Sequence, residues 1–194
     1  MTLKTAMIVE EEQMNNRIYI SGYFEDFEKI ELKDIEQKLS MHQISLSVRN
    51  LKGCLMQSAL DLADYELIMF SYELIKTFLL SGSYDILKYF LIQLWEKVSK
   101  SEKIPFTIGI ENIPINNSHE NIKIKIDGNL SKHQKELVIN RTFDAVDNLI
   151  SNDFKLKEKS RFYDVFNAHL LKYNLTDDTF EEIDIEKEIL NKRN

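Results

Sequence analysis

Apolar and polar residues alternate along two nearby segments in the second half of the chain. Pro105–Ile113 alternates first, and Asn121–Ile126 alternates again after the polar turn Ile115–Glu120. Alternation with a period of two is typical of strands that bury one face, so these segments predict a β-hairpin. Asp127-Gly128 ends the second strand, and apolar residues at helical spacing then predict a helix over Ser131–Ile150. This unit indicates a protein of mixed α and β structure.

Two more strands are predicted in the first half of the chain. Arg17–Phe24 is rich in β-branched and aromatic residues, and Ile44–Val48 alternates apolar residues with Ser. Between them, Glu31–Met41 has apolar residues at helical spacing and predicts a helix. Thr5–Val9 is compatible with either a short strand or a frayed helix.

The middle of the chain is the most hydrophobic part. Met56–Leu80 is apolar on most faces of a helix, which is typical of a central helix. Gly82 is expected to close this helix, and a second helix is predicted over Tyr84–Ser99. Toward the C-terminus, the patterns of Arg161–Tyr173 and Thr179–Lys192 predict two further helices.

The order of these elements predicts an α+β fold. We expect a small, mostly antiparallel sheet of about four strands in ferredoxin-like order, covered by a long helical block, with C-terminal helices. Residues 1–150 would form the α+β sandwich core, and residues 151–194 a helical C-terminal extension with an acidic end. An analogy at the level of the fold implies no function.

Composition narrows the class of protein. The chain has 194 residues, of which 43% are hydrophobic, enough for a folded domain with a core. A net charge of −7 argues against general nucleic-acid binding, because phosphate contacts need clustered Lys and Arg. Charges interrupt the apolar stretch Leu67–Val98, so no membrane span is predicted. A single cysteine, Cys54, and acidic residues where a signal peptide would be apolar lead us to expect a cytoplasmic protein.

No catalytic, metal or nucleotide motif is recognisable in the sequence, so no catalytic residue, metal site or cofactor is predicted. The histidines do not pair with other ligand residues at the spacing of a metal site; they are His42, His119, His133 and His169. Surface or core roles are therefore expected for them.

Two features favour binding to a partner. Tyr89 and Ile92 lie off the main apolar stripe of the helix predicted over Tyr84–Ser99, where they would meet a partner or a second subunit. The alternative is that this helix is buried between two layers. The second feature is a cluster of acids near the C-terminus: Asp177, Asp178, Glu181, Asp184 and Glu188. In a helix, most of these would line one face that suits a basic surface, and a solvated helix end is the alternative.

These features support the hypothesis of a non-catalytic protein-binding module, such as an inhibitor, an immunity or anti-defence protein, or an adaptor that occludes a partner surface. Its partner would be another protein with a basic surface, and a homo-oligomer is also compatible with the sequence. The alternative is an enzyme or small-ligand-binding protein whose pocket lies between the sheet and the helices. In that case His169, Arg161 and Cys54 are the first groups to inspect.

Overall fold

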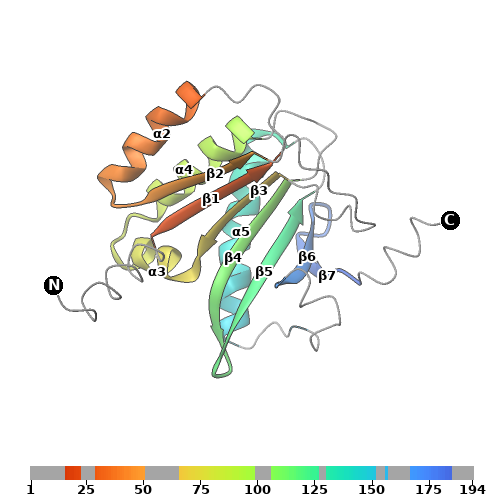
Figure 1. Cartoon of the computed structure of the whole chain (residues 1–194). Coiled ribbons are helices and arrows are strands. Elements are labelled where there is room, and N and C mark those ends of the chain that lie inside the picture. The colour runs from red at the N-terminus through yellow and green to blue at the C-terminus, as the bar shows by residue number, and fades with distance from the viewer. Residues whose placement is uncertain are drawn as a thin grey trace, which may run out of the picture.

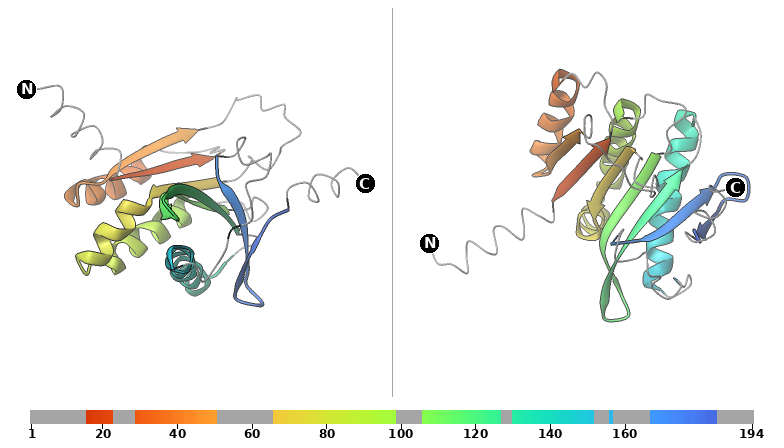
Figure 2. Two further views of the ribbon diagram at one scale, coloured as in Figure 1. Left: turned by 90° about the horizontal axis from the view of Figure 1, so that it is seen from below. Right: turned by 45° about the vertical axis from the view of Figure 1, so that its right-hand side comes forward.

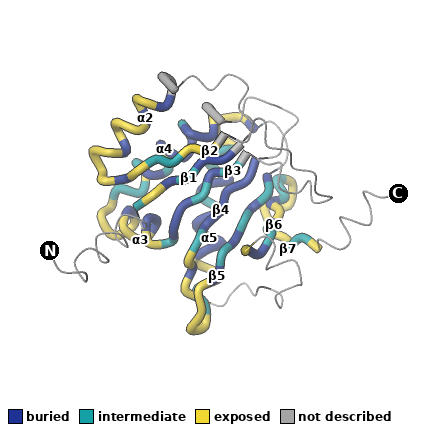
Figure 3. Tube along the Cα trace, in the orientation of Figure 1, coloured by how far each residue is buried: buried dark blue, intermediate teal, exposed yellow. Residues whose placement is uncertain are grey.

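The computed structural model describes residues 16–22, 29–50, 66–98, 106–126, 130–151, 156 and 167–184. These residues form one mixed β-sheet, and the helices that the structure describes cover one face of it (Figures 1 and 2). The buried positions concentrate along the central strands, while the tip of the hairpin between two of them is exposed (Figure 3).

The sheet has seven described strands in the order β2-β1-β3-β4-β5-β6-β7. Their bounds are β1 Arg17–Gly22, β2 Ser45–Asn50, β3 Glu66–Ser71, β4 Phe106–Ile115, β5 Ser118–Ile126, β6 His169–Asn174 and β7 Thr179–Glu182. Parallel pairing joins β1 to β2, β3 to β4 and β5 to β6, and antiparallel pairing joins the remaining neighbours.

Each parallel pair is connected through helix, as parallel neighbours require a crossover. α2 (Lys29–Met41) lies between β1 and β2 in the chain, and α3 (Tyr72–Leu80) and α4 (Tyr84–Val98) lie between β3 and β4. α5 (Lys132–Ile150) lies between β5 and β6. The described part of the chain is therefore built from three β-helix-β units placed side by side, with β7 added at the end.

The core lies between the sheet and these helices. One row of side chains crosses the sheet in register from Ile18 through Phe70, Ile110 and Ile122, and all four are buried. The ring of Phe70 meets the ring of Phe143 on α5 edge to face, with centroids 6.1 Å apart. This contact shows that the face of β3 that carries Phe70 is turned toward α5.

The expectation of a mostly antiparallel, four-stranded sheet in ferredoxin-like order is wrong, because the sheet is mixed and much larger. β3 lies inside Met56–Leu80, where the sequence predicts a helix, and it pairs with β1 on one side and β4 on the other. A strand in the middle of a sheet is apolar on consecutive residues, so its pattern resembles that of a buried helix. Residues 56–65 of that prediction lie outside the described residues.

The expectation of C-terminal helices is also wrong where the structure describes the chain. β6 occupies the end of the segment Arg161–Tyr173, and β7 occupies the start of Thr179–Lys192. Burial alternates along β6, which pairs with β5 and so extends the sheet of the preceding residues. Asp178 has a positive φ of 53° in the turn between β6 and β7, a conformation that Asp tolerates well.

Several local predictions are confirmed. The hairpin forms β4 and β5, but its turn is shorter than the predicted Ile115–Glu120, because β4 continues to Ile115 and β5 begins at Ser118. The turn after α3 contains Gly82 with a φ of 67°, as a residue that closes a helix requires. The helix predicted over Ser131–Ile150 forms α5. Ser131 caps it, because its hydroxyl accepts from the Gln134 backbone while the Gln134 side chain accepts from the Ser131 backbone. Thr5–Val9 lies outside the described residues.

Candidate functional site

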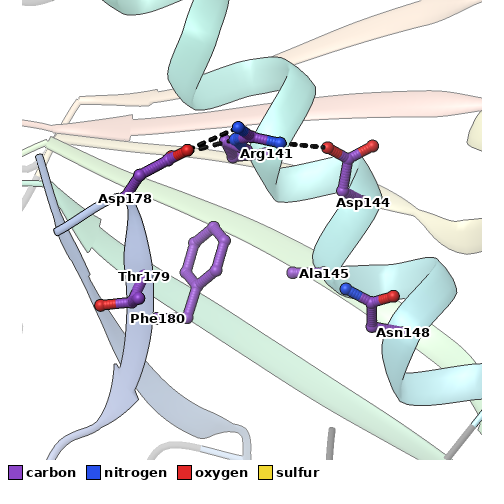
Figure 4. Close-up of a pocket in the computed structure, with 7 residues that line it drawn as sticks. All are labelled: Arg141, Asp144, Ala145, Asn148, Asp178, Thr179 and Phe180. Carbon is purple, nitrogen blue, oxygen red and sulfur yellow. Dashed lines mark hydrogen bonds and ion pairs between the residues drawn. The ribbon is translucent and has the colours of Figure 1, made fainter. Parts of the chain in front are cut away.

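A groove with a volume of about 390 Å³ runs between α5 and the hairpin of β6 and β7 (Figure 4). The described residues that line it are Arg141, Asp144, Ala145, Asn148, Asp178, Thr179 and Phe180. The first four come from α5, where spacings of three, four and seven residues place side chains on one face of a helix. The other three come from the turn and the first residues of β7.

Arg141 joins the two walls of the groove. Its Nε donates to Asp178 Oδ1 at 2.9 Å, and its Nη2 donates to the other oxygen of the same carboxylate. Its Nη1 donates to Asp144 Oδ2 at 3.2 Å on α5. The Tyr173 hydroxyl adds a hydrogen bond of 2.6 Å to Asp178. A guanidinium held by both oxygens of one carboxylate has little freedom, so this network holds the β6–β7 turn against α5.

The network changes the acidity of its members. Hydrogen bonds from Arg141 and Tyr173 lower the pKa of Asp178, because they stabilise the charged carboxylate. Burial and the hydrogen bond to Asp178 raise the pKa of Tyr173 to about 12. Both shifts favour the pairing seen in the structure, with Tyr173 as donor and Asp178 as charged acceptor.

The surface of α5 beside the groove is negative. Burial raises the pKa of Asp147, and the neighbouring Asp144 raises it further. Burial, Asp144, Asp85 and Asp147 together raise the pKa of Tyr84 to about 12. Burial is the main cause of both shifts, and the nearby carboxylates add to it because like charges disfavour further negative charge.

The floor of the groove is apolar, and an amide and a hydroxyl also line it. The Phe180 ring lies between β7 and α5 and packs against the Tyr173 ring, with centroids 5.0 Å apart. Ala145 is small and leaves space beside that ring. Asn148 of α5 and Thr179 of β7 supply these two polar groups.

A second polar cluster crosses β5, β6 and β7 on the side of the sheet that faces the helices. His169 is only 5% exposed, and its Nδ1 lies 3.0 Å from Glu182 Oε1. Its Nε2 lies 3.7 Å from Glu120 Oε2, and the Ser118 hydroxyl donates to the other oxygen of Glu120 at 2.9 Å. This cluster joins three strands. The described part of the chain contains no group of three or more His, Cys, Asp or Glu arranged to hold a metal ion.

The predicted acidic face is divided by the strand β7. Asp178 lies in the groove. Glu181 does not line the groove and is the partner of Lys172 in the pairing of β6 with β7. Asp177 accepts a hydrogen bond of 2.6 Å from the Asn174 amide. Asp184 is exposed just after β7, and Glu188 lies outside the described residues. A strand sends neighbouring side chains to opposite faces, so the single face expected of a helix does not form here.

The two predicted contact residues on α4 differ in exposure. Tyr89 is 47% exposed, whereas Ile92 is 4% exposed and belongs to the core. Of the groups named for a pocket, His169 is part of the buried cluster, and Arg161 and Cys54 lie outside the described residues.

Arg141, Asp144 and Asn148 were not singled out from the sequence. Their spacing shows that they share one face of α5, but an isolated charged face is usually solvated. The signal that distinguishes them is the contact with Asp178, which lies 37 residues beyond Arg141 in the chain.

No protein-family model, curated protein or solved structure matches this chain. Each helix that the structure describes is too short or too polar to cross a membrane.

Asp178→Asn is expected to make stability less dependent on pH. A carboxyl whose pKa falls on folding stabilises the fold above its unfolded-state pKa of about 3.9, and this stabilisation is lost as the pH falls through the lower folded value. The free-energy advantage of the wild type over Asp178→Asn should therefore be present at pH 7 and shrink below about pH 4. Urea denaturation at a series of pH values measures it.

The control is the same substitution in an Arg141→Gln background, where the main cause of the lowered pKa is removed. There the difference between Asp and Asn should depend much less on pH. A difference that stays constant from neutral to acidic pH in both backgrounds would contradict this account of Asp178.

Proposed function

We propose that this protein is a non-catalytic module that binds another protein, and that the groove between α5 and β7 accepts a basic side chain of that partner. The observation that carries the proposal is the composition of the groove: among the described residues that line it, the two carboxylates Asp144 and Asp178 face one cation, Arg141, around an aromatic floor. The groove is thus suited to one additional positive charge.

A Lys or Arg side chain matches the groove along its length. Its apolar stem would pack across Phe180 and beside Ala145, as long basic side chains do on apolar surfaces. Its charged end would reach Asp144, whose side chain is 59% exposed and so retains capacity to accept hydrogen bonds. The carbonyl of the Asn148 amide and the Thr179 hydroxyl supply two further acceptors.

The charge of the whole chain supports the same partner chemistry. A net charge of −7 attracts a basic surface over distances longer than a contact, which raises the rate of association. A protein seated on α5 and the β6–β7 hairpin would have its own basic surface covered. Such covering is how an inhibitor or an adaptor acts without performing chemistry.

The proposal is tested by NMR titration of the full chain with N-acetyl-arginine methylamide, a neutral-backbone probe of one basic side chain. We expect saturable shift changes at α5 and β7, and binding about threefold weaker for Asp144→Asn, since a partly exposed ion pair contributes less than about 1 kcal/mol. Asp34→Asn, an exposed acid on α2, is the matched control and should bind as the wild type does.

N-acetyl-glutamate methylamide is the control ligand and should cause no saturable change. Equal binding of the acidic and basic probes, or equal binding by Asp144→Asn and the wild type, would overturn the assignment of the groove.

The volume of the groove also favours a second candidate, a small-ligand-binding protein that takes a free cationic metabolite, because pockets for small molecules begin at about 300 Å³. Free arginine separates the two candidates. A protein partner presents its basic side chain without a nearby carboxylate, so the blocked probe should bind more tightly than free arginine. Tighter binding of free arginine would favour the metabolite.

A further inference from the structure

The two outer strands of the sheet differ in how their edges are protected. β7 has four residues, and Glu181, Glu182 and Asp184 surround its end with negative charge. β2 has six residues, and its first four, Ser45–Val48, contain no charged residue, no Pro and no break in register with β1. Short length and charged side chains are the usual means of preventing an edge strand from pairing with another chain. β2 is longer than β7, and Ser45–Val48 carry no charge.

The backbone of β2 has hydrogen-bonding groups directed away from the sheet. The Ser45 N–H donates to the Asn16 carbonyl at 2.9 Å, so the backbone of Ser45 faces β1. Successive residues of a strand direct their backbone groups to opposite sides, and Leu46 and Val48 therefore direct theirs outward. β1 is the one described strand that pairs with β2, which is the outermost strand in Figure 1.

The segment that leads into β2 and forms its first residues contains exposed apolar side chains. Leu39–Val48 is a run of ten residues without Lys, Arg, Asp or Glu in a chain that is 29% charged. Within it, Met41 is 72% exposed and Val48 is 40% exposed. Charged residues are depleted and Met is enriched in the centres of protein interfaces, so this run has the composition of a contact surface.

We infer that the outer edge of β2 binds an extended, uncharged segment of another protein, which adds a strand to the sheet. The segment would pair with the backbone of Leu46 and Val48 and place an apolar side chain against Val48. The inference does not depend on the groove, which lies at the opposite end of the strand order.

A segment of another protein fits this edge better than a second copy does. α2 packs against β2, and a symmetric pair of β2 strands would bring two α2 helices to the same seam. Packed helices need about 8–10 Å between their axes, whereas an added strand needs only about 4.8 Å. Two α2 helices would therefore be crowded at such a seam, whereas a single added strand would not be.

The experiment uses a displayed library of random linear peptides about ten residues long, selected against the full chain, as the source of probes. A selected peptide should slow hydrogen exchange of the Leu46 and Val48 amides by about tenfold or more, and change the inward-facing Ser47 amide much less. Val48→Pro removes the outward N–H without removing a bond to β1, and should weaken binding by about tenfold or more.

Two further variants keep the test decisive if Val48→Pro does not fold. Val48→Lys retains the N–H but places a charge on the edge and should also weaken binding, while Val48→Thr retains the β-branched shape and should bind nearly as the wild type does. Selection of no peptide, or binding that Val48→Pro and Val48→Lys leave unchanged, would overturn the inference. So would a dimer of the 22.9 kDa chain in which the Leu46 and Val48 amides are already protected, because a second copy would then occupy the edge.

Discussion

Phe70→Ala is expected to lower the free energy of unfolding by about 3–5 kcal/mol, the range for removing a large aromatic side chain from a core. Phe70 is 2% exposed in β3, with Ile18 and Ile110 as its neighbours in register on either side. Its ring also meets Phe143 on α5, so the substitution empties space where the sheet contacts the helices. Urea denaturation followed by circular dichroism measures the effect.

Leu80→Ala is the control for Phe70→Ala. Leu80 is also a large apolar residue, but it is 80% exposed at the end of α3, so its loss should change stability by no more than about 0.5 kcal/mol. If the two substitutions had similar costs, Phe70 would not occupy the buried position that β3 gives it. The comparison therefore also tests whether this segment is a strand in the centre of the sheet.

His169→Ala is expected to lower the free energy of unfolding by about 2–3 kcal/mol, because a hydrogen bond to a charged group contributes about that much. The ring is buried at the start of β6, between Glu120 of β5 and Glu182 of β7. Its removal leaves the Glu182 carboxylate without the Nδ1 donor at 3.0 Å and opens space between strands. Urea denaturation at neutral pH measures the loss.

His119→Ala is the matched control, because His119 is exposed near the tip of the β4–β5 hairpin. Its removal should change stability by no more than about 0.5 kcal/mol. His169→Gln offers a second comparison, since its amide can still donate to the Glu182 carboxylate. Recovery of part of the loss in His169→Gln would support the hydrogen-bonding role, and equal losses in the two variants would assign the effect to packing alone.

The groove and the β2 edge lie at opposite ends of the strand order. Six inter-strand steps of about 4.8 Å place them roughly 29 Å apart across the sheet. Substitutions so far apart, with no shared contacts, are expected to act independently. Asp144→Asn should therefore leave peptide binding at β2 unchanged, and Val48→Lys should leave binding of the arginine probe unchanged.

The sequence by itself determined the elements whose signals are local. Alternation within Pro105–Ile113 and Asn121–Ile126 identified β4 and β5, and apolar residues at helical spacing identified α5. Gly82 marked the end of α3. These signals lie within short stretches of the chain, such as the turn that ends a helix or the period of two along a strand, so they are readable without knowing the rest of the fold.

Only the tertiary structure decided the size of the sheet and the position of the groove. β3 is apolar because β1, β4 and the helices surround it, and the same residues would suit a buried helix. β7 is a strand because β6 pairs with it, although its acids also suit a helix. The groove exists because that hairpin carries Asp178 to Arg141 across 37 residues of chain. Contacts at such separations arise from the packing of whole elements, and the local pattern at either end does not contain them.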